Sequence, residues 1–166
     1  SYSVTGVQTC ALPIWIIKNV RKAVALAGRY GCTHIRAFAD VDSKAKLEGV
    51  KALIRAREEF KGIVDIQVVA FAQDGLVREP GAEDLLRQAM KLGSDVVGGI
   101  PWIEYTDADI AKHVEICFKI AKEFNKPVSM LVDDAGDAGL RSLELMALET
   151  IRSEEHTSEL QSPNTI

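Results

Sequence analysis

The sequence predicts an α/β fold, a partial (β/α)8 TIM barrel in which about four parallel strands alternate with helices. Segments with apolar residues at helical spacing alternate with short apolar segments typical of strands. Only a few residues connect successive segments, so strands separated by helices are expected to run parallel with right-handed crossovers. Polar side chains follow every expected strand, as at the C-terminal mouth of a β/α barrel.

The first half of the chain contains two expected helices and two expected strands. Residues 16–27 repeat apolar residues at helical spacing and end near Gly31, a residue type that stops helices. Residues 33–41 then predict a strand, and residues 46–60 predict a helix with one apolar stripe. Residues 65–71 are almost continuously apolar, which indicates a strand buried on both faces.

The second half continues the alternation. Residues 81–92 predict a helix stopped by a glycine, and residues 95–100 predict a short strand. A helix is expected over residues 106–124, with a threonine N-cap and an aspartate three residues later that approximates a capping box. An Asn-Lys-Pro break leads to a strand over residues 128–132 and a final helix over residues 139–151.

An open doubly wound sheet is the alternative architecture. No expected strand is followed by GxGxxG, and Gly98-Gly99 lies inside a strand, so a dinucleotide-binding sheet is disfavoured. The polar residues after the strands favour a barrel, because barrels collect functional groups from several successive strands at one mouth. These residues are Asp40, Asp42, Gln73, Asp74, Glu104, Asp133, Asp134 and Asp137.

The two ends of the chain resemble translated sequencing adapter. Residues 152–162 back-translate to a DNA string that resembles a short-read library adapter. Residues 4–14 back-translate to its reverse complement, apart from the first base and a closing T. Two disordered tails would not predict that complementarity. We therefore expect residues 1–14 and 152–166 to be adapter-derived and non-native, and residues 15–151 to be a fragment of a longer barrel.

Composition excludes several classes of protein. The formal net charge is −4, which gives no basic footprint for nucleic acid and no polybasic patch for membranes. No apolar run approaches the roughly 18 residues needed to span a bilayer. With Cys10 set aside as adapter-encoded, Cys32 and Cys117 stand without a CxxC motif, so a reduced, cytoplasmic protein is expected.

Several motifs carry a family resemblance. Residues 31–36, 65–75 and 92–101, together with the Asp133-Asp134 pair and Arg141, resemble the cytosine deaminase branch of the amidohydrolase superfamily. The motifs occur in order over essentially all of the native stretch. The resemblance implies a metal-dependent (β/α)8 barrel that hydrolyses a non-peptide C–N bond in a small cyclic or amide substrate. A divalent metal, zinc or iron, would activate water, and a nearby carboxylate would carry the proton to the leaving nitrogen.

The resemblance also implies roles for individual residues. Gln73 matches the position that holds a pyrimidine-like ring, a task that suits an amide because it offers both a donor and an acceptor. Glu104 matches the family at the mouth, and Phe38 replaces a second mouth histidine, so both join Gln73 as expected substrate-binding residues. Asp134 matches the catalytic glutamate, and Asp133 is its neighbour, so these two are the expected catalytic residues.

One departure concerns the metal. Leu131 occupies the position of a family histidine that binds metal, and leucine cannot coordinate any metal. We therefore expect no metal ligand within this chain, unless Asp133 or Asp134 is recruited, because the family's other ligands lie outside residues 15–151. Asp134 is also one methylene shorter than the glutamate it replaces.

Other readings of the polar residues are open. His34 is expected to be a buried histidine paired with a barrel-interior carboxylate rather than a ligand, and His113 is expected on the surface of an outer helix. Both native cysteines are expected to be packing residues. Asp133, Asp134 or Asp137 could instead cap the final helix.

Two functional classes remain for the parent protein: an amidohydrolase or deaminase, or a metal-deficient, non-catalytic relative that binds a small ligand. The isolated fragment is expected to be inactive. Its first and last strands would have unpaired edges, which predicts self-association into homo-oligomers or aggregates.

Overall fold

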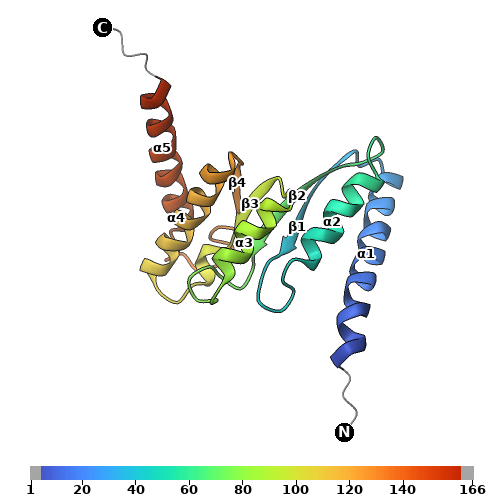
Figure 1. Cartoon of the computed structure of the whole chain (residues 1–166). Helices are drawn as coiled ribbons and strands as arrows, with labels where there is room; N and C mark the ends of the chain where they lie inside the picture. Colours follow the sequence, from blue (N-terminus) through green and yellow to red (C-terminus); the bar gives the residue numbers. More distant parts are fainter. Residues whose placement is uncertain (1–4, 162–166) are drawn as a thin grey trace.

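The computed structural model describes residues 5–161, with side chains from residue 13 to residue 154. Within these described residues, five helices alternate with four strands, and one short 3₁₀ helix follows the third strand (Figure 1). The helices are α1 (Thr5–Arg29), α2 (Glu48–Glu59), α3 (Ala82–Lys91), η1 (Pro101–Ile103), α4 (Asp107–Phe124) and α5 (Ser142–Gln161). The strands are β1 (His34–Asp40), β2 (Asp65–Ala72), β3 (Val96–Gly99) and β4 (Val128–Met130).

The four strands form one parallel sheet in the order β1-β2-β3-β4, so the predicted α/β fold is confirmed. Chain order equals sheet order because each helix returns the chain to the start of the next parallel strand. The register aligns Asp40 with Phe71, Phe71 with Gly98, and Gly98 with Ser129. The carboxyl ends of all four strands therefore lie along one edge of the sheet.

The core lies between the sheet and the helices. Val68, Ala70 and Val97 are fully buried in one apolar cluster with residues of α2, α3 and α4. On the opposite face Val69 and Phe71 are also buried, so the strand predicted to be buried on both faces is confirmed. Within the described residues no helix is long and apolar enough to cross a membrane.

The first strand is different, because only one of its faces is covered. Side chains from His34 to Asp40 alternate between exposed and less exposed positions, and His34, Arg36 and Phe38 point to the open face. The expected burial of His34 is wrong. Its side chain is 78% exposed, although its Nε2 lies 3.4 Å from a carboxylate oxygen of Asp65. In a sheet of four strands, no further strands curve around to cover this face.

Several element ends differ from the prediction. α1 begins at Thr5 rather than at residue 16, and α5 begins at Ser142 rather than at residue 139. The chain before α5 makes tight turns, in which Asp137 Oδ1 accepts a hydrogen bond from the Gly139 backbone N–H. The predicted start of α4 is confirmed, because the Thr106 hydroxyl accepts a hydrogen bond from the Asp109 backbone N–H at 3.2 Å.

Candidate functional site

Acidic side chains follow β1 and β2 at the sheet edge. Asp42 is buried, and its Oδ1 accepts the backbone N–H groups of Lys44 and Ala45 at 2.6 and 2.7 Å. This arrangement is a side-chain-stabilised turn, which occupies Asp42 within the loop. The carboxylate of Asp74 lies 3.7 Å from the Lys44 ammonium, so the loops after β1 and β2 meet here.

Asp40, the last residue of β1, has a raised pKa. Partial burial raises the pKa of Asp40, and repulsion from Asp42 and Asp74 raises it further. No positively charged partner of Asp40 occurs among the described residues. The edge therefore holds a carboxyl group that keeps its proton more readily than an ordinary aspartate does.

Gln73 comes directly after β2 and is half-buried. Its backbone N–H donates to the carbonyl oxygen of Phe71 at 3.0 Å, whereas its side-chain amide makes no hydrogen bond to any residue that the structure describes. Phe38 packs edge-on against Phe71, with ring centroids 5.3 Å apart and planes at 86°. An uncommitted amide and a partly exposed aromatic ring are the groups that bind flat polar rings. Substrate contacts by Gln73 and Phe38 remain predictions.

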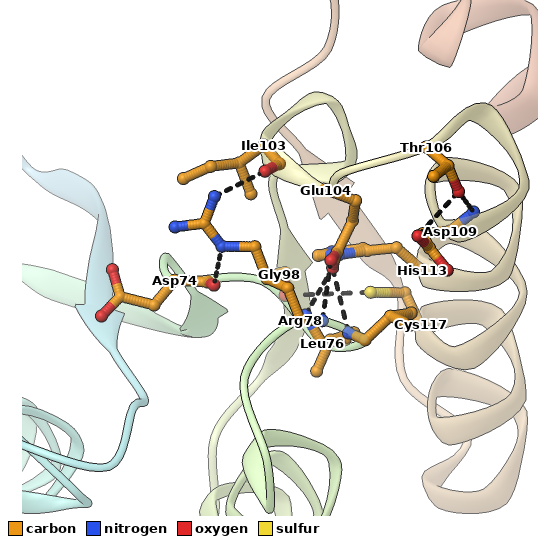
Figure 2. A network of polar contacts seen from close by, with 11 residues as sticks. Asp74, Leu76, Arg78, Gly98, Ile103, Glu104, Thr106, Asp109, His113 and Cys117 are labelled. Carbon is orange, nitrogen blue, oxygen red and sulfur yellow. Dashed lines mark hydrogen bonds and ion pairs between the residues drawn. The ribbon is translucent and has the colours of Figure 1, made fainter.

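Glu104, which follows η1, is the most highly connected side chain of the mouth (Figure 2). Its Oε1 accepts the backbone N–H groups of Leu76 at 2.6 Å and Val77 at 3.0 Å. Its Oε2 accepts the Arg78 N–H at 2.9 Å. Three successive N–H groups thus form a nest around one carboxylate, an arrangement typical of anion-binding concavities. Here the anion is the protein's own Glu104 carboxylate. Contact between Glu104 and a substrate stays a prediction.

The electrostatics of Glu104 follow from these contacts. Burial alone would raise the pKa of Glu104, because it disfavours the charged form. The hydrogen bonds from His113 and from the three backbone N–H groups outweigh burial and lower that pKa to about 2. Glu104 is therefore ionised throughout the neutral range, and its buried charge is compensated entirely by hydrogen-bond donors.

Arg78, in the loop after β2, also connects this loop to the loop after β3. Its Nε donates to the Asp74 carbonyl oxygen at 2.9 Å, and its Nη1 donates to the Ile103 carbonyl oxygen at 2.7 Å. The guanidinium carbon also lies 5.3 Å from the centre of the Tyr105 ring, within cation–π range. The loop after β2 and the loop after β3 are consequently joined by Arg78 from one side and by Glu104 from the other.

His113 was expected at the surface, and this expectation is wrong. The residue is fully buried on α4, and its Nδ1 lies 2.7 Å from Glu104 Oε1. Its Nε2 is buried without a hydrogen-bond partner among the described residues and packs against the backbone of Gly99. The sequence contained a signal, because Ile110, Val114 and Cys117 form an apolar helical stripe that includes position 113.

The loop after β4 places the expected catalytic pair differently. Asp133 has a positive φ of 53°, and its Oδ1 accepts the backbone N–H of Ser142 at 2.8 Å, while Oδ2 accepts that of Leu143 at 3.1 Å. The hydrogen bond from the Ser142 hydroxyl lowers the pKa of Asp133, and the two backbone hydrogen bonds lower it further. Slight burial acts in the opposite direction but is outweighed. Asp133 therefore caps α5, the structural alternative recognised in the sequence. Asp134 is exposed and makes no side-chain hydrogen bond or ion pair within the described part of the chain.

The residues present do not fit a metal ion. Leu131 is 39% exposed, directly after β4, and its backbone N–H donates to the Gly99 carbonyl oxygen at 3.0 Å. From residue 13 to residue 154, no group of three or more His, Cys, Asp or Glu side chains is placed to hold a metal.

Comparison with known proteins places this geometry in a family. The chain is 36% identical over 124 residues to the N-isopropylammelide isopropyl amidohydrolase of Pseudomonas sp. (strain ADP), a match that covers 75% of this chain and 30% of that protein. The relatives and structural neighbours of the chain are thus enzymes of the amidohydrolase family. It is also 26% identical over 149 residues to an uncharacterized protein of Escherichia coli (strain K12). No protein-family profile matches the chain.

Solved amidohydrolase structures agree in fold. The 5-methylcytosine deaminase from Klebsiella pneumoniae, liganded with 5-fluorocytosine, superposes with a TM-score of 0.81 at 30% identity over 85% of this chain and 34% of that chain. The N-isopropylammelide isopropylaminohydrolase from Burkholderia multivorans gives a TM-score of 0.66 at 33% identity over 74% of this chain and 31% of that one. The predicted resemblance to this enzyme family and the partial TIM barrel are both confirmed. The chain spans about a third of the length of these relatives.

Proposed function

We propose that this chain is one portion of a metal-dependent amidohydrolase or deaminase that hydrolyses a non-peptide C–N bond in a small cyclic or amide substrate. The observation that carries the proposal is the 36% identity to an amidohydrolase over 124 residues, 75% of this chain. The uncommitted side-chain amide of Gln73 at that mouth supports it. The two unpaired native cysteines agree with a reducing, cytoplasmic setting.

Within this proposal each mouth residue has a task that its chemistry allows. The Gln73 amide donates a hydrogen bond to one polar atom of a heterocyclic substrate and accepts one from an adjacent atom. The exposed aromatic ring of Phe38 covers the edge of that heterocycle. Asp134, which is exposed and has no partner among the described residues, carries the proton to the leaving nitrogen. The metal, zinc or iron, is held by ligands on parts of the parent barrel outside this chain.

The chain alone is expected to have no deaminase activity, because the described residues provide no metal site. The test is to express the complete parent reading frame and the 166-residue chain in parallel, and to measure release of ammonia or amine from cytosine, 5-methylcytosine and N-isopropylammelide. Metal-dependent turnover by the parent alone is the expected result. Turnover by the chain alone, or none by a folded, metal-loaded parent, would overturn the proposal.

A second candidate is a metal-deficient relative that binds a ligand without catalysis. Leu131 favours it, because an aliphatic side chain stands at the strand end where the family resemblance implies a metal ligand. The two candidates differ in the parent protein. A parent that binds cytosine but contains no zinc or iron by elemental analysis would favour the binding protein.

We further propose that residues 1–14 and 152–166 are translated adapter and that residues 15–151 are the native stretch. The complementarity of the two back-translated ends supports this division. Self-association is proposed for the isolated chain, because β1 and β4 are edge strands of the described sheet.

A further inference from the structure

The carboxylate of Glu104 is enclosed entirely by the protein. It lies in the loop between β3 and α4, yet three of its hydrogen bonds go to the preceding loop, between β2 and α3. The fourth comes from His113 on α4. One side chain thus connects three consecutive parts of the barrel mouth. We propose that Glu104 and His113 are positioning residues that fix Gln73 in the conformation needed to hold a substrate ring. The proposal rests on the ring-binding role proposed above for Gln73.

Gln73 is held from both directions along the chain. On its N-terminal side it hydrogen-bonds to Phe71, in the fully buried C-terminal part of β2. On its C-terminal side, Leu76 is the first of the three residues whose N–H groups bind the Glu104 carboxylate. Only Asp74 and Gly75 separate Gln73 from Leu76. The Asp74 carbonyl oxygen is itself bound by Arg78, so little freedom remains in this segment.

Gly75 allows this close approach. It has a φ of +95°, in the left-handed region that glycine adopts without strain. A Cβ atom at this position would lie 2.8 Å from Glu104 Oε1 and 2.8 Å from Arg78 Cγ. The backbone at position 75 therefore lies so near to the carboxylate that a side chain would collide with it.

His113 determines the orientation of the carboxylate. An ionised carboxylate only accepts hydrogen bonds, so the Nδ1–H of His113 must donate to Glu104 Oε1. The histidine ring cannot move away, because it packs against the Gly99 backbone, where even a Cβ atom would collide with it. His113 is therefore held in place by β3 and in turn orients Glu104. Glu104 then fixes the loop that contains Gln73 by accepting hydrogen bonds from its backbone N–H groups.

The charged and titratable groups around the pair are few. Arg78 approaches from the loop, and Cys117 packs one turn along α4 (Figure 2). Burial raises the pKa of the Cys117 thiol well above its ordinary value, so this residue stays neutral. Cys117 is fully buried and makes no hydrogen bond to Glu104 within the described residues. It provides a matched position for a control variant.

The test uses the full 166-residue chain labelled with ¹⁵N. Hydrogen exchange of the backbone amides of residues 76–78 and the side-chain amide resonance of Gln73 are measured in three variants. His113→Leu removes the donor, His113→Asn retains an N–H donor near the Nδ1 position, and Cys117→Ala removes a buried side chain on the same face of α4. We expect His113→Leu to speed exchange at residues 76–78 at least tenfold relative to Cys117→Ala, and to shift the Gln73 resonance. His113→Asn should restore most of the protection, which a general loss of packing would not explain.

Equal protection of residues 76–78 in the His113→Leu and Cys117→Ala variants would overturn the proposal. If His113→Leu does not fold, Glu104→Asp is measured in the same way, because it withdraws the carboxylate from the loop while keeping its charge. A titration with cytosine separates the two claims. If cytosine leaves the Gln73 resonance of the complete parent protein unchanged, the ring-binding role fails, whereas the exchange rates still decide whether Glu104 and His113 fix the loop.

Discussion

Replacement of Glu104 by glutamine tests whether the buried carboxylate stabilises the barrel mouth as the structure indicates. Glu104→Gln preserves size but removes the charge, and in either orientation it turns an NH2 group toward an N–H donor, that of Arg78 at Oε2 or those of Leu76 and Val77 at Oε1. The pKa of Glu104 is lowered from 4.5 to about 2 in the folded chain. At about 1.4 kcal/mol per pKa unit, the ionised form stabilises the folded state by roughly 3 kcal/mol at neutral pH. This is a large share of the roughly 5–15 kcal/mol typical of a domain.

The pH dependence gives the sign of the effect. Because the folded-state pKa of Glu104 is depressed, its contribution is complete above pH 4.5 and is lost as the pH falls toward 2. The difference in unfolding free energy between the unmodified chain and Glu104→Gln should therefore be about 3 kcal/mol at pH 7 and should shrink steadily below pH 4.5. Urea unfolding monitored by circular dichroism at several pH values measures this difference.

Glu59→Gln is the matched control. Hydrogen bonds from Arg21 and Arg55, against slight desolvation, also lower the pKa of Glu59 to about 2, but Glu59 lies at the protein surface. Its loss should cost much less, because solvent and salt screen exposed ion pairs. A cost for Glu104→Gln below about 1 kcal/mol at pH 7, or a cost independent of pH, would refute the reasoning.

Three further changes have defined outcomes. Gly75→Ala should lower the melting temperature more than Gly81→Ala, because both positions have positive φ but only a Cβ at position 75 would collide with Glu104; equal losses would contradict this. Asp40→Asn should raise the melting temperature at pH 7, because the raised pKa means that ionised Asp40 is disfavoured in the folded chain. That gain should disappear at acidic pH, where Asp40 is protonated, and a gain at every pH would argue against repulsion. Asp133→Ala should increase amide exchange at the start of α5 while β2 stays protected, and unchanged exchange there would show that the cap is dispensable.

The alternation of helices and strands was readable from the sequence because apolar spacing directly reflects which faces are buried. Residues 65–71 show this most clearly, since both faces of β2 are covered. The Thr106 cap was predictable for a similarly local reason, because the donor it satisfies lies three residues along the chain. The boundaries of α5 were less predictable, because the Asp133 cap reaches across nine residues.

The long-range polar contacts of the mouth could not be read from the sequence. Glu104 was expected at the mouth, but its partners at residues 76–78 come from the preceding loop and are backbone groups, which every residue has. His113 was misplaced because a histidine on an outer helix is ordinarily solvated, although its apolar neighbours on the helix indicated burial. The burial predicted for His34 was wrong for the opposite reason, because it requires strands that the four-stranded sheet does not include.

The central claim is that residues 15–151 are an internal portion of an amidohydrolase barrel joined to adapter sequence at both ends. Long-read sequencing of the source DNA across the junctions at Ile14–Trp15 and Ile151–Arg152 tests it most directly. We predict that the native reading frame continues past both junctions into the remaining strands of a barrel, with histidine and aspartate metal ligands. Source DNA that encodes residues 1–14 and 152–166 as written would contradict the claim.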